Sequence, residues 1–140
     1  MSSAPFIRKA LVVDLDFLYP ILLTNKTWLL RPRPTTVRGR VGLIAKGNCL
    51  VVGVASIIDC TRLLPSEVVS ATQQLHGISH GDQRMAKFAA CRCAWILSDV
   101  TRLRYPVDYE HRRGWSTWVD IDAGVAAEIQ LQVDRGERPP

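Results

Sequence analysis

Two apolar runs rich in β-branched residues lie close together near the middle of the chain, GRVGLIA at residues 39–45 and CLVVGVASIIDC at residues 49–60. Only Lys-Gly-Asn separates them, and Gly47 and Asn48 tolerate the positive φ angles of a tight turn. Paired runs of this kind are typical of neighbouring strands in a sheet. The sequence therefore predicts a β-hairpin here.

The remaining apolar segments predict further strands and two or three helices. Asp14 ends the first apolar run and can cap a following helix, while Pro32 and Pro34 exclude both a helix and a continuous ladder and so predict a rigid loop. Strands are expected at residues 9–13, 27–31, 93–103 and 114–121, and helices at residues 15–25, 64–77 and about 82–90. We expect an α+β fold, a small and mostly antiparallel β-barrel with two or three flanking helices.

The chain has the size of one compact domain. It contains 140 residues, 47% of them hydrophobic, which is enough for a real core. We expect a domain over residues 9–132 between flexible tails at residues 1–8 and 133–140. Carboxylates interrupt the first apolar run, so no secretion signal is expected, and residues 49–58 reach only half the length of a membrane-spanning helix. These features indicate a cytoplasmic protein without a membrane segment.

The four cysteines predict reduced thiols and no metal site. Cys49, Cys60, Cys91 and Cys93 lie in apolar sequence without the spacing of a disulfide scaffold. The Cys-x-Cys at residues 91–93 could form half of a zinc site with His76 and His80, but two clean ligand pairs around a short loop are absent. We expect no metal and no cofactor.

A basic segment at residues 24–47 indicates an anionic partner. It holds six Lys or Arg residues and no Asp or Glu, and no carboxylate occurs between residues 17 and 58. The whole chain has a net charge of +5, concentrated in its first half. The prolines at 32 and 34 hold arginines on a stiff loop that loses little entropy on binding. We expect RNA or another single-stranded nucleic acid as the partner, with an acidic protein partner as an alternative.

A second mixture of cations and aromatic rings follows near the end of the chain. Arg112 and Arg113 precede Trp115 and Trp118, a combination that can stack bases while holding phosphates. Three residues apart in a strand, the two tryptophans face opposite sides, and Trp118 beside Val119 is the better core candidate. Trp115 is therefore the predicted stacking residue. The apolar surroundings of Trp28 and Trp95 predict core positions for both.

Several segments in order resemble the ASCH family of PUA-like proteins. They are LLTNKTWLLRPRPTTVRGRVGLIAKG, VVGVASIIDC, CAWILSDVTRL and YPVDYEHRRGWSTWV, and the resemblance spans residues 9–121. The positions that match the family pattern are Lys26, Arg31, Gly39, Arg40, Gly53, Asp59, Ala94, Trp95, Gly114 and Trp118. The resemblance implies a PUA-like barrel whose cleft, lined by the Lys loop and the following strand, binds RNA or a modified nucleoside. Family members include RNA-interacting proteins, amidohydrolases that act on N4-acetylcytidine, and ribonucleases.

The sequence departs from the family at the position of the amidohydrolase nucleophile. That branch carries Thr three residues after the loop lysine and most other members carry Glu, whereas this chain has Leu29. Leucine can neither attack nor accept a proton, so Lys26 is the one remaining catalytic candidate, as a base with a lowered pKa.

We therefore expect an RNA-binding protein without catalysis of its own; the alternative is a hydrolase of a modified nucleoside or of RNA on the same fold. The predicted RNA-binding residues are Lys26, Thr27, Arg31, Arg33, Arg38, Arg40, Arg112, Arg113 and Trp115.

Overall fold

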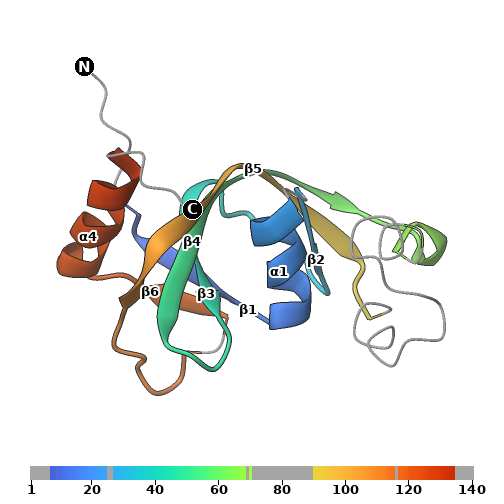
Figure 1. Cartoon of the computed structure of the whole chain (residues 1–140). Helices are drawn as coiled ribbons and strands as arrows, with labels where there is room; N and C mark the ends of the chain where they lie inside the picture. Colours follow the sequence, from blue (N-terminus) through green and yellow to red (C-terminus); the bar gives the residue numbers. More distant parts are fainter. Residues whose placement is uncertain (1–6, 25–26, 69, 71–89, 116, 135–140) are drawn as a thin grey trace.

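The computed structural model describes residues 7–24, 27–68, 70, 90–115 and 117–134, and it is built on one six-stranded sheet (Figure 1). The strands are β1 (Lys9–Val13), β2 (Trp28–Arg31), β3 (Gly39–Ala45), β4 (Leu50–Arg62), β5 (Cys93–Asp108) and β6 (Trp118–Asp120). The helices are α1 (Leu15–Thr24) and α4 (Ala123–Asp134), and residues 65–68 and 70 are also helical. No helix in these ranges is long and apolar enough to cross a membrane.

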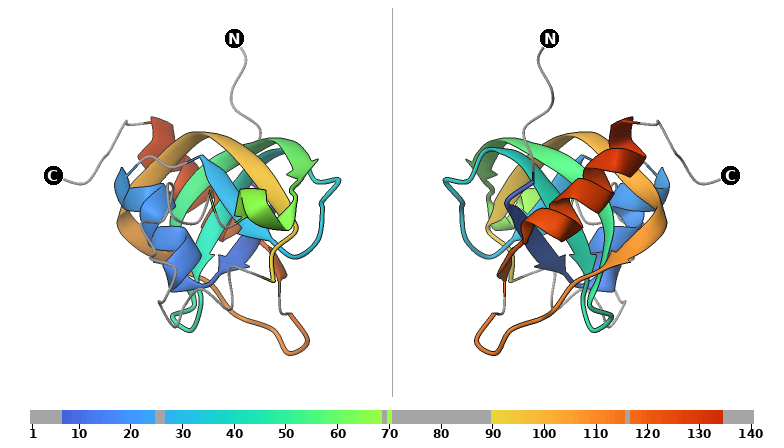
Figure 2. Two further views of the ribbon diagram at one scale, coloured as in Figure 1. Left: turned by 90° about the vertical axis from the view of Figure 1, so that its right-hand side faces the viewer. Right: turned by 90° about the vertical axis from the view of Figure 1, so that its left-hand side faces the viewer.

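The sheet is mixed and runs in the order β2-β5-β4-β3-β1-β6. β1 and β3 pair in parallel, and the other four neighbouring pairs are antiparallel. The expected α+β fold with a mostly antiparallel sheet is confirmed. The strands curve around a common interior (Figure 2), but within the described ranges no ladder joins the outer strands β2 and β6. The predicted barrel is therefore an open, curled sheet.

The hairpin predicted from the two central apolar runs is β3 and β4. Their antiparallel register runs from Gly39 opposite Ile57 to Ala45 opposite Leu50. In the connecting turn the positive φ angles fall on Gly47 (93°) and on Cys49 (52°). The prediction that Asn48 would supply such an angle was wrong, because the second positive φ angle of the turn falls one residue later, on Cys49.

Helix α1 begins where Asp14 was expected to cap it. The Asp14 carboxylate accepts a hydrogen bond from the Asp16 N–H at 3.0 Å, and the Asp14 carbonyl accepts from the Leu18 N–H at 3.0 Å. The helix then directs Leu18 and Ile21, both fully buried, into the interior of the curled sheet. The Asp14 cap thus fixes where α1 begins, and with it the position of these two core side chains.

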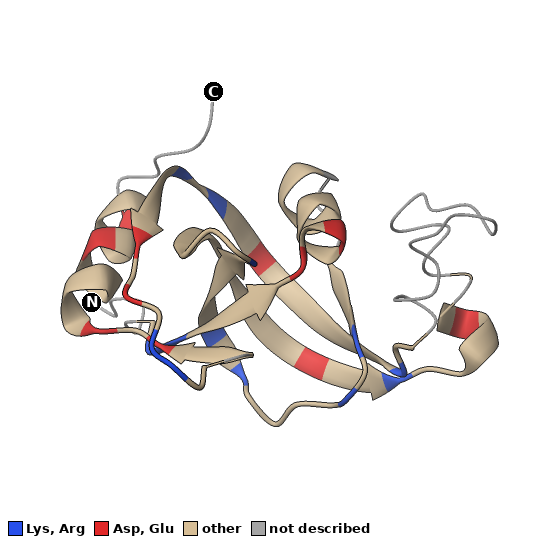
Figure 3. Cartoon of the chain, turned by 90° about the horizontal axis from the view of Figure 1, so that it is seen from below, with Lys and Arg blue, Asp and Glu red and all other residues tan. Residues whose placement is uncertain are grey.

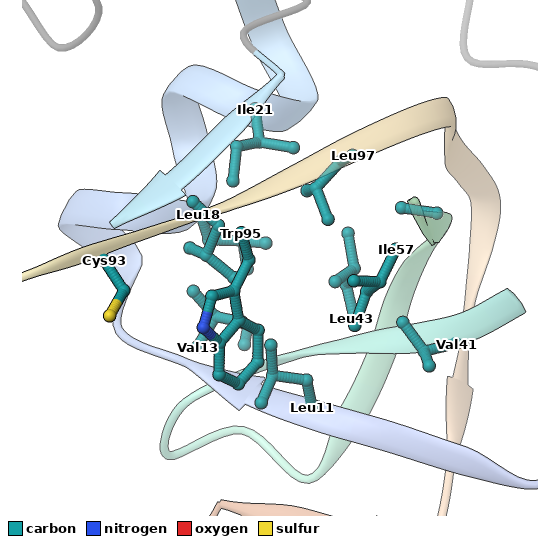
Figure 4. Close-up of a cluster of buried hydrophobic side chains, with 13 residues drawn as sticks. Leu11, Val13, Leu18, Ile21, Val41, Leu43, Ile57, Cys93, Trp95 and Leu97 are labelled. Carbon is teal, nitrogen blue, oxygen red and sulfur yellow. The ribbon is translucent and has the colours of Figure 1, made fainter. Parts of the chain in front are cut away.

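The interior core consists of side chains that alternate along the strands. Figure 4 shows Trp95 projecting from β5 toward Leu11 and Val13 of β1. Trp95 is 3% exposed, as its predicted core position requires. The main cluster comprises Leu11, Val13, Leu18, Ile21, Leu29, Val41, Leu43, Ala45, Ala55, Ile57, Cys93, Trp95 and Leu97.

Two predicted helices lie wholly or partly outside the described residues. The helix expected at residues 64–77 is seen at residues 65–68 and 70, and the Glu67 carboxylate accepts from the Leu64 N–H at its start at 2.8 Å. The helix expected at about 82–90 lies outside the described residues, apart from residue 90. Of the expected tails, the structure describes a buried Ile7 and a carbonyl of Arg8 that accepts from the Ile121 N–H.

Helix α4 was not predicted from the sequence. It covers the outer face of the sheet (Figure 2) and buries only every third residue, Ala126, Ile129 and Gln132. Val125 and Val133 pack partly against the same core, so the inward positions have helical spacing, but the polar Gln132 interrupts the apolar stripe. The usable signal was Asp122, whose carboxylate accepts from the Val125 N–H at 2.8 Å.

Gln132 attaches α4 to an irregular part of β5. Its side-chain oxygen accepts from the Tyr105 N–H at 3.1 Å, and its Nε2 donates to the Tyr105 carbonyl at 2.7 Å. The β4–β5 register jumps here, because Gly53 faces Arg102 while Val51 faces Val107. The side chain therefore satisfies backbone groups that the ladder leaves unpaired.

Replacing Gln132 by Leu is expected to lower the free energy of unfolding by roughly 1 to 2 kcal/mol, because two backbone groups lose their partners. Urea unfolding would measure this as a lower midpoint. Gln130→Leu is the matched control, since Gln130 is half-buried and its side chain donates to Asp134 on the helix surface. An equal loss in both variants would contradict the role of Gln132.

Candidate functional site

A cavity of about 350 Å³ opens between the two outer strands of the sheet. One wall is the end of β2 and the loop that follows it, the other is the start of β6, and Trp95 of β5 completes the lining. We call this cavity the seam pocket. Its lining residues are Arg31, Pro32, Arg33, Pro34, Thr35, Trp95, Thr117 and Trp118.

Two tryptophans form an aromatic surface in the seam pocket. The rings of Trp95 and Trp118 stack with centroids 6.0 Å apart and an angle of 11° between their planes. The Trp95 Nε1–H donates to the Arg33 carbonyl at 2.9 Å, which fixes the proline-flanked loop to the core. Trp118 is half-buried, because it packs on the core and also borders the cavity. The pocket thus combines a rigid wall with an aromatic one.

Arg31 places a cation against this aromatic surface. Its guanidinium carbon lies 5.1 Å from the centre of the Trp95 ring, a cation–π distance. Its Nε is buried and has no hydrogen-bond partner among the described residues. Burial lowers the pKa of Arg31, but an arginine side chain stays protonated in proteins. The pocket therefore contains a charged and incompletely solvated donor.

The Cys91 thiol, which acts on the pKa of Arg31, does not neutralise it. Burial raises the pKa of the Cys91 thiol to about 11, although Arg31 and Arg92 act in the opposite direction. At pH 7 this thiol is therefore uncharged. No carboxylate lines the seam pocket among the described residues. The positive charge of Arg31 is left available to a ligand.

The other arginines of the basic segment are divided between the seam pocket and a second cavity. Arg33 is exposed on the seam pocket's wall, whereas Arg38 and Arg40 line a separate cavity of about 370 Å³ together with Arg8 and Lys9. Arg8 and Lys9 were not predicted as binding residues, because Arg8 is the last residue of the expected tail and Lys9 the first of the expected domain. Their signal was a pair of adjacent cations at the start of a predicted strand.

The predicted stacking residue Trp115 lines a third cavity, separate from the other two. Its ring is 5.8 Å from the Arg112 guanidinium carbon, and both line a cavity of about 180 Å³ near the start of α4. His111 holds this loop, since its Nε2 lies 3.0 Å from the Trp115 carbonyl oxygen and its Nδ1 lies 2.8 Å from the Tyr109 hydroxyl. Arg113 is exposed in the same loop. The structure brings Trp118 rather than Trp115 beside Arg31.

Among the described residues, neither Thr27 nor Leu29 lines the seam pocket. Lys26 lies outside the described residues. Thr27 is exposed, and its carbonyl accepts from the Leu97 N–H at 2.7 Å. Leu29 is fully buried in the main core, opposite Trp95 in the β2–β5 ladder. The described part of the chain contains no group of three His, Cys, Asp or Glu that could hold a metal, and His76 and His80 lie outside it.

Lys and Arg are absent from the described helices. Figure 3 shows Lys and Arg on strands and loops, whereas Asp and Glu occur on helices and on strands, for example Asp59 of β4 and Asp99 of β5. Within the described ranges α1, α4 and the helical residues 65–68 and 70 carry no Lys or Arg. The basic surface is therefore formed by the sheet and its connections, where the cavities open.

Comparison with solved structures agrees with this architecture. The chain is similar to the crystal structure of ASCH from Zymomonas mobilis, with a TM-score of 0.63 and 14% identity over 86% of this chain and 92% of that one. A serine-to-alanine mutant of the same protein matches with a TM-score of 0.62, 14% identity and coverages of 91% and 96%. A tyrosine-to-phenylalanine mutant matches with a TM-score of 0.63, 15% identity and coverages of 86% and 94%. No protein-family model and no curated protein matches the sequence. The chain has the ASCH fold, which confirms the fold that the resemblance implied.

Proposed function

We propose that the protein binds single-stranded RNA, with one nucleotide held in the seam pocket. Trp118, which is half-buried and stacks on the buried Trp95, offers a ring on which a base can stack, and Arg31 offers donors to a phosphate or to the edge of the base. Arg33 lies at the wall of the pocket and can contact the backbone of the strand.

The observation that carries this proposal is the Arg31 Nε, which is buried and has no hydrogen-bond partner among the residues that the structure describes. A polar group removed from water is costly unless it is hydrogen-bonded, and the cost is larger for a charged group. An anionic or acceptor-rich ligand in the pocket offsets this cost. The ASCH fold is compatible with nucleic-acid binding, and the comparison supports the proposal through the fold alone.

The aromatic contribution can be tested at Trp118. Trp118→Leu is expected to weaken binding of a labelled single-stranded RNA of about 12 nucleotides by roughly 1 to 2 kcal/mol, because a leucine has no face for stacking. Trp118→Phe keeps an aromatic ring and should retain most of the affinity. Fluorescence anisotropy at several salt concentrations would measure both.

The salt dependence in this experiment should be the same for the parent and the two variants, because neither substitution removes a charge. If the leucine variant binds as tightly as the parent, no base stacks in the seam pocket. Cleavage of the RNA during the titration would instead favour the hydrolase.

A further inference from the structure

A second cavity carries four cations that come from two separate parts of the chain. Arg8 and Lys9 lie at the start of β1, and Arg38 and Arg40 flank the start of β3. Gly39 lies between the two arginines with a φ of 97°, a left-handed conformation that glycine adopts without strain. Val37 and Val41 complete the lining of this cavity, which we call the β1–β3 pocket.

The charges of the β1–β3 pocket are not neutralised within the described residues. Arg38 Nη1 donates to the carbonyls of Thr35 and Val37 at 2.8 and 2.9 Å, and Arg40 Nη1 donates to the Asp99 carbonyl at 2.8 Å. These neutral oxygens orient the guanidinium groups and leave their charge in place. None of the pocket's four cations forms an ion pair in the described part of the chain.

Two acidic residues lie close to this cluster, Asp99, whose carbonyl accepts from Arg40, and Asp120, and neither lines the β1–β3 pocket. Asp120 is opposite Lys9 in the β1–β6 ladder. It lines the cavity beside Trp115 and not the β1–β3 pocket. The lining of the β1–β3 pocket thus contains cations and no Asp or Glu among the described residues, which suits an anion.

The two pockets adjoin through one short segment. Thr35 lines the seam pocket, and its carbonyl accepts the hydrogen bond from Arg38 of the β1–β3 pocket. The Thr35 hydroxyl also accepts from the Val37 N–H at 3.0 Å, so the connection is held by its own hydrogen bonds. This segment joins the seam pocket to Arg38, which is one of the four cations of the β1–β3 pocket.

We propose that the β1–β3 pocket binds the phosphate backbone of the same RNA strand whose neighbouring nucleotide occupies the seam pocket. This inference rests on the proposed function and extends it, because it makes the ligand an oligonucleotide rather than a nucleoside. The continuity with an aromatic pocket favours RNA over an acidic peptide, which has no base to stack there. Arg8 and Lys9 then bind RNA from outside the basic segment.

The test is the double variant Arg8→Gln/Lys9→Gln, measured by anisotropy with a single-stranded RNA of about 12 nucleotides. Each phosphate that is no longer neutralised should reduce the slope of log affinity against log salt by about 0.7, so the expected reduction is roughly 0.7 to 1.4. Binding of the mononucleotide uridine 5′-monophosphate should not change, because it fills only the seam pocket.

The matched control is Lys46→Gln/Arg102→Gln, which removes the same charge from exposed residues outside the three pockets. An equal fall in slope in the control, or an unchanged slope in the test variant, would overturn the inference. The proposed function would still stand in that case if Trp118→Leu weakens binding.

A competition experiment tests for an acidic peptide as the ligand. If polyglutamate of the same length displaces the RNA from the parent but not from the test variant, the pocket is a site for acidic peptides, and the inference fails. If no variant of either pocket weakens the binding of RNA or of the mononucleotide, the proposed function fails as well.

Discussion

Arg31→Gln is expected to weaken RNA binding by about 1.5 to 3 kcal/mol, or roughly 10- to 150-fold, the usual worth of a hydrogen bond to a charged group. Glutamine keeps part of the side chain's volume and removes the cation that lies 5.1 Å from the Trp95 ring. Both the oligonucleotide and uridine 5′-monophosphate should lose affinity, because both use the seam pocket. Isothermal titration calorimetry with each ligand would measure the two losses.

The stability of the same variant separates a binding role from a structural one. The buried Arg31 Nε, which has no partner in the described part of the chain, costs stability, and the cation–π contact with Trp95 contributes stability, so the two effects offset each other. The free energy of unfolding of Arg31→Gln should therefore stay close to that of the parent. Arg33→Gln, in the loop that follows β2, is the control, and we expect a smaller loss of affinity because Arg33 is exposed. Unchanged affinity together with lower stability in Arg31→Gln would show that Arg31 serves the fold and not a ligand.

Local sequence signals predicted most of the strands, because each signal lies within the segment it specifies. The β-branched runs of β3 and β4, the Asp14 cap and the proline-flanked loop all form as expected. The parallel pairing of β1 with β3 could not be predicted, since it joins segments with a helix and a strand between them. Helix α4 was missed because the polar Gln132 occupies a core-facing position.

The basic segment was predicted as one surface, but the fold divides it. Arg31 and Arg33 face the seam pocket, whereas Arg38 and Arg40 turn to a cavity that they share with Arg8. This division depends on the sheet order, because β3 pairs with β1 while β2 pairs with β5. The stacking of Trp95 on Trp118 could not be predicted for the same reason. Trp95 belongs to β5 and Trp118 to β6, and nothing in either segment indicates that the two side chains meet.

Leu29→Thr is expected to lower the free energy of unfolding by about 2 to 5 kcal/mol, since the site loses apolar volume and gains a buried hydroxyl. Leu29 is fully buried in the main core and stands opposite Trp95 in the ladder. Restoring the residue that the amidohydrolase branch carries at this position therefore places a hydroxyl in the core and not in the seam pocket. Urea unfolding would measure the loss of stability.

The same variant should not hydrolyse N4-acetylcytidine, and neither should the parent, because the residue 29 side chain lies among the apolar groups of the core and does not line the seam pocket. Ile58→Thr is the control for stability: it makes a similar aliphatic-to-threonine change at a side chain that is 56% exposed, where a surface substitution costs about 0.5 kcal/mol or less. Chromatographic detection of cytidine would report turnover. If Leu29→Thr is as stable as Ile58→Thr and releases cytidine, residue 29 reaches the ligand, and the choice of binding over hydrolysis is reversed.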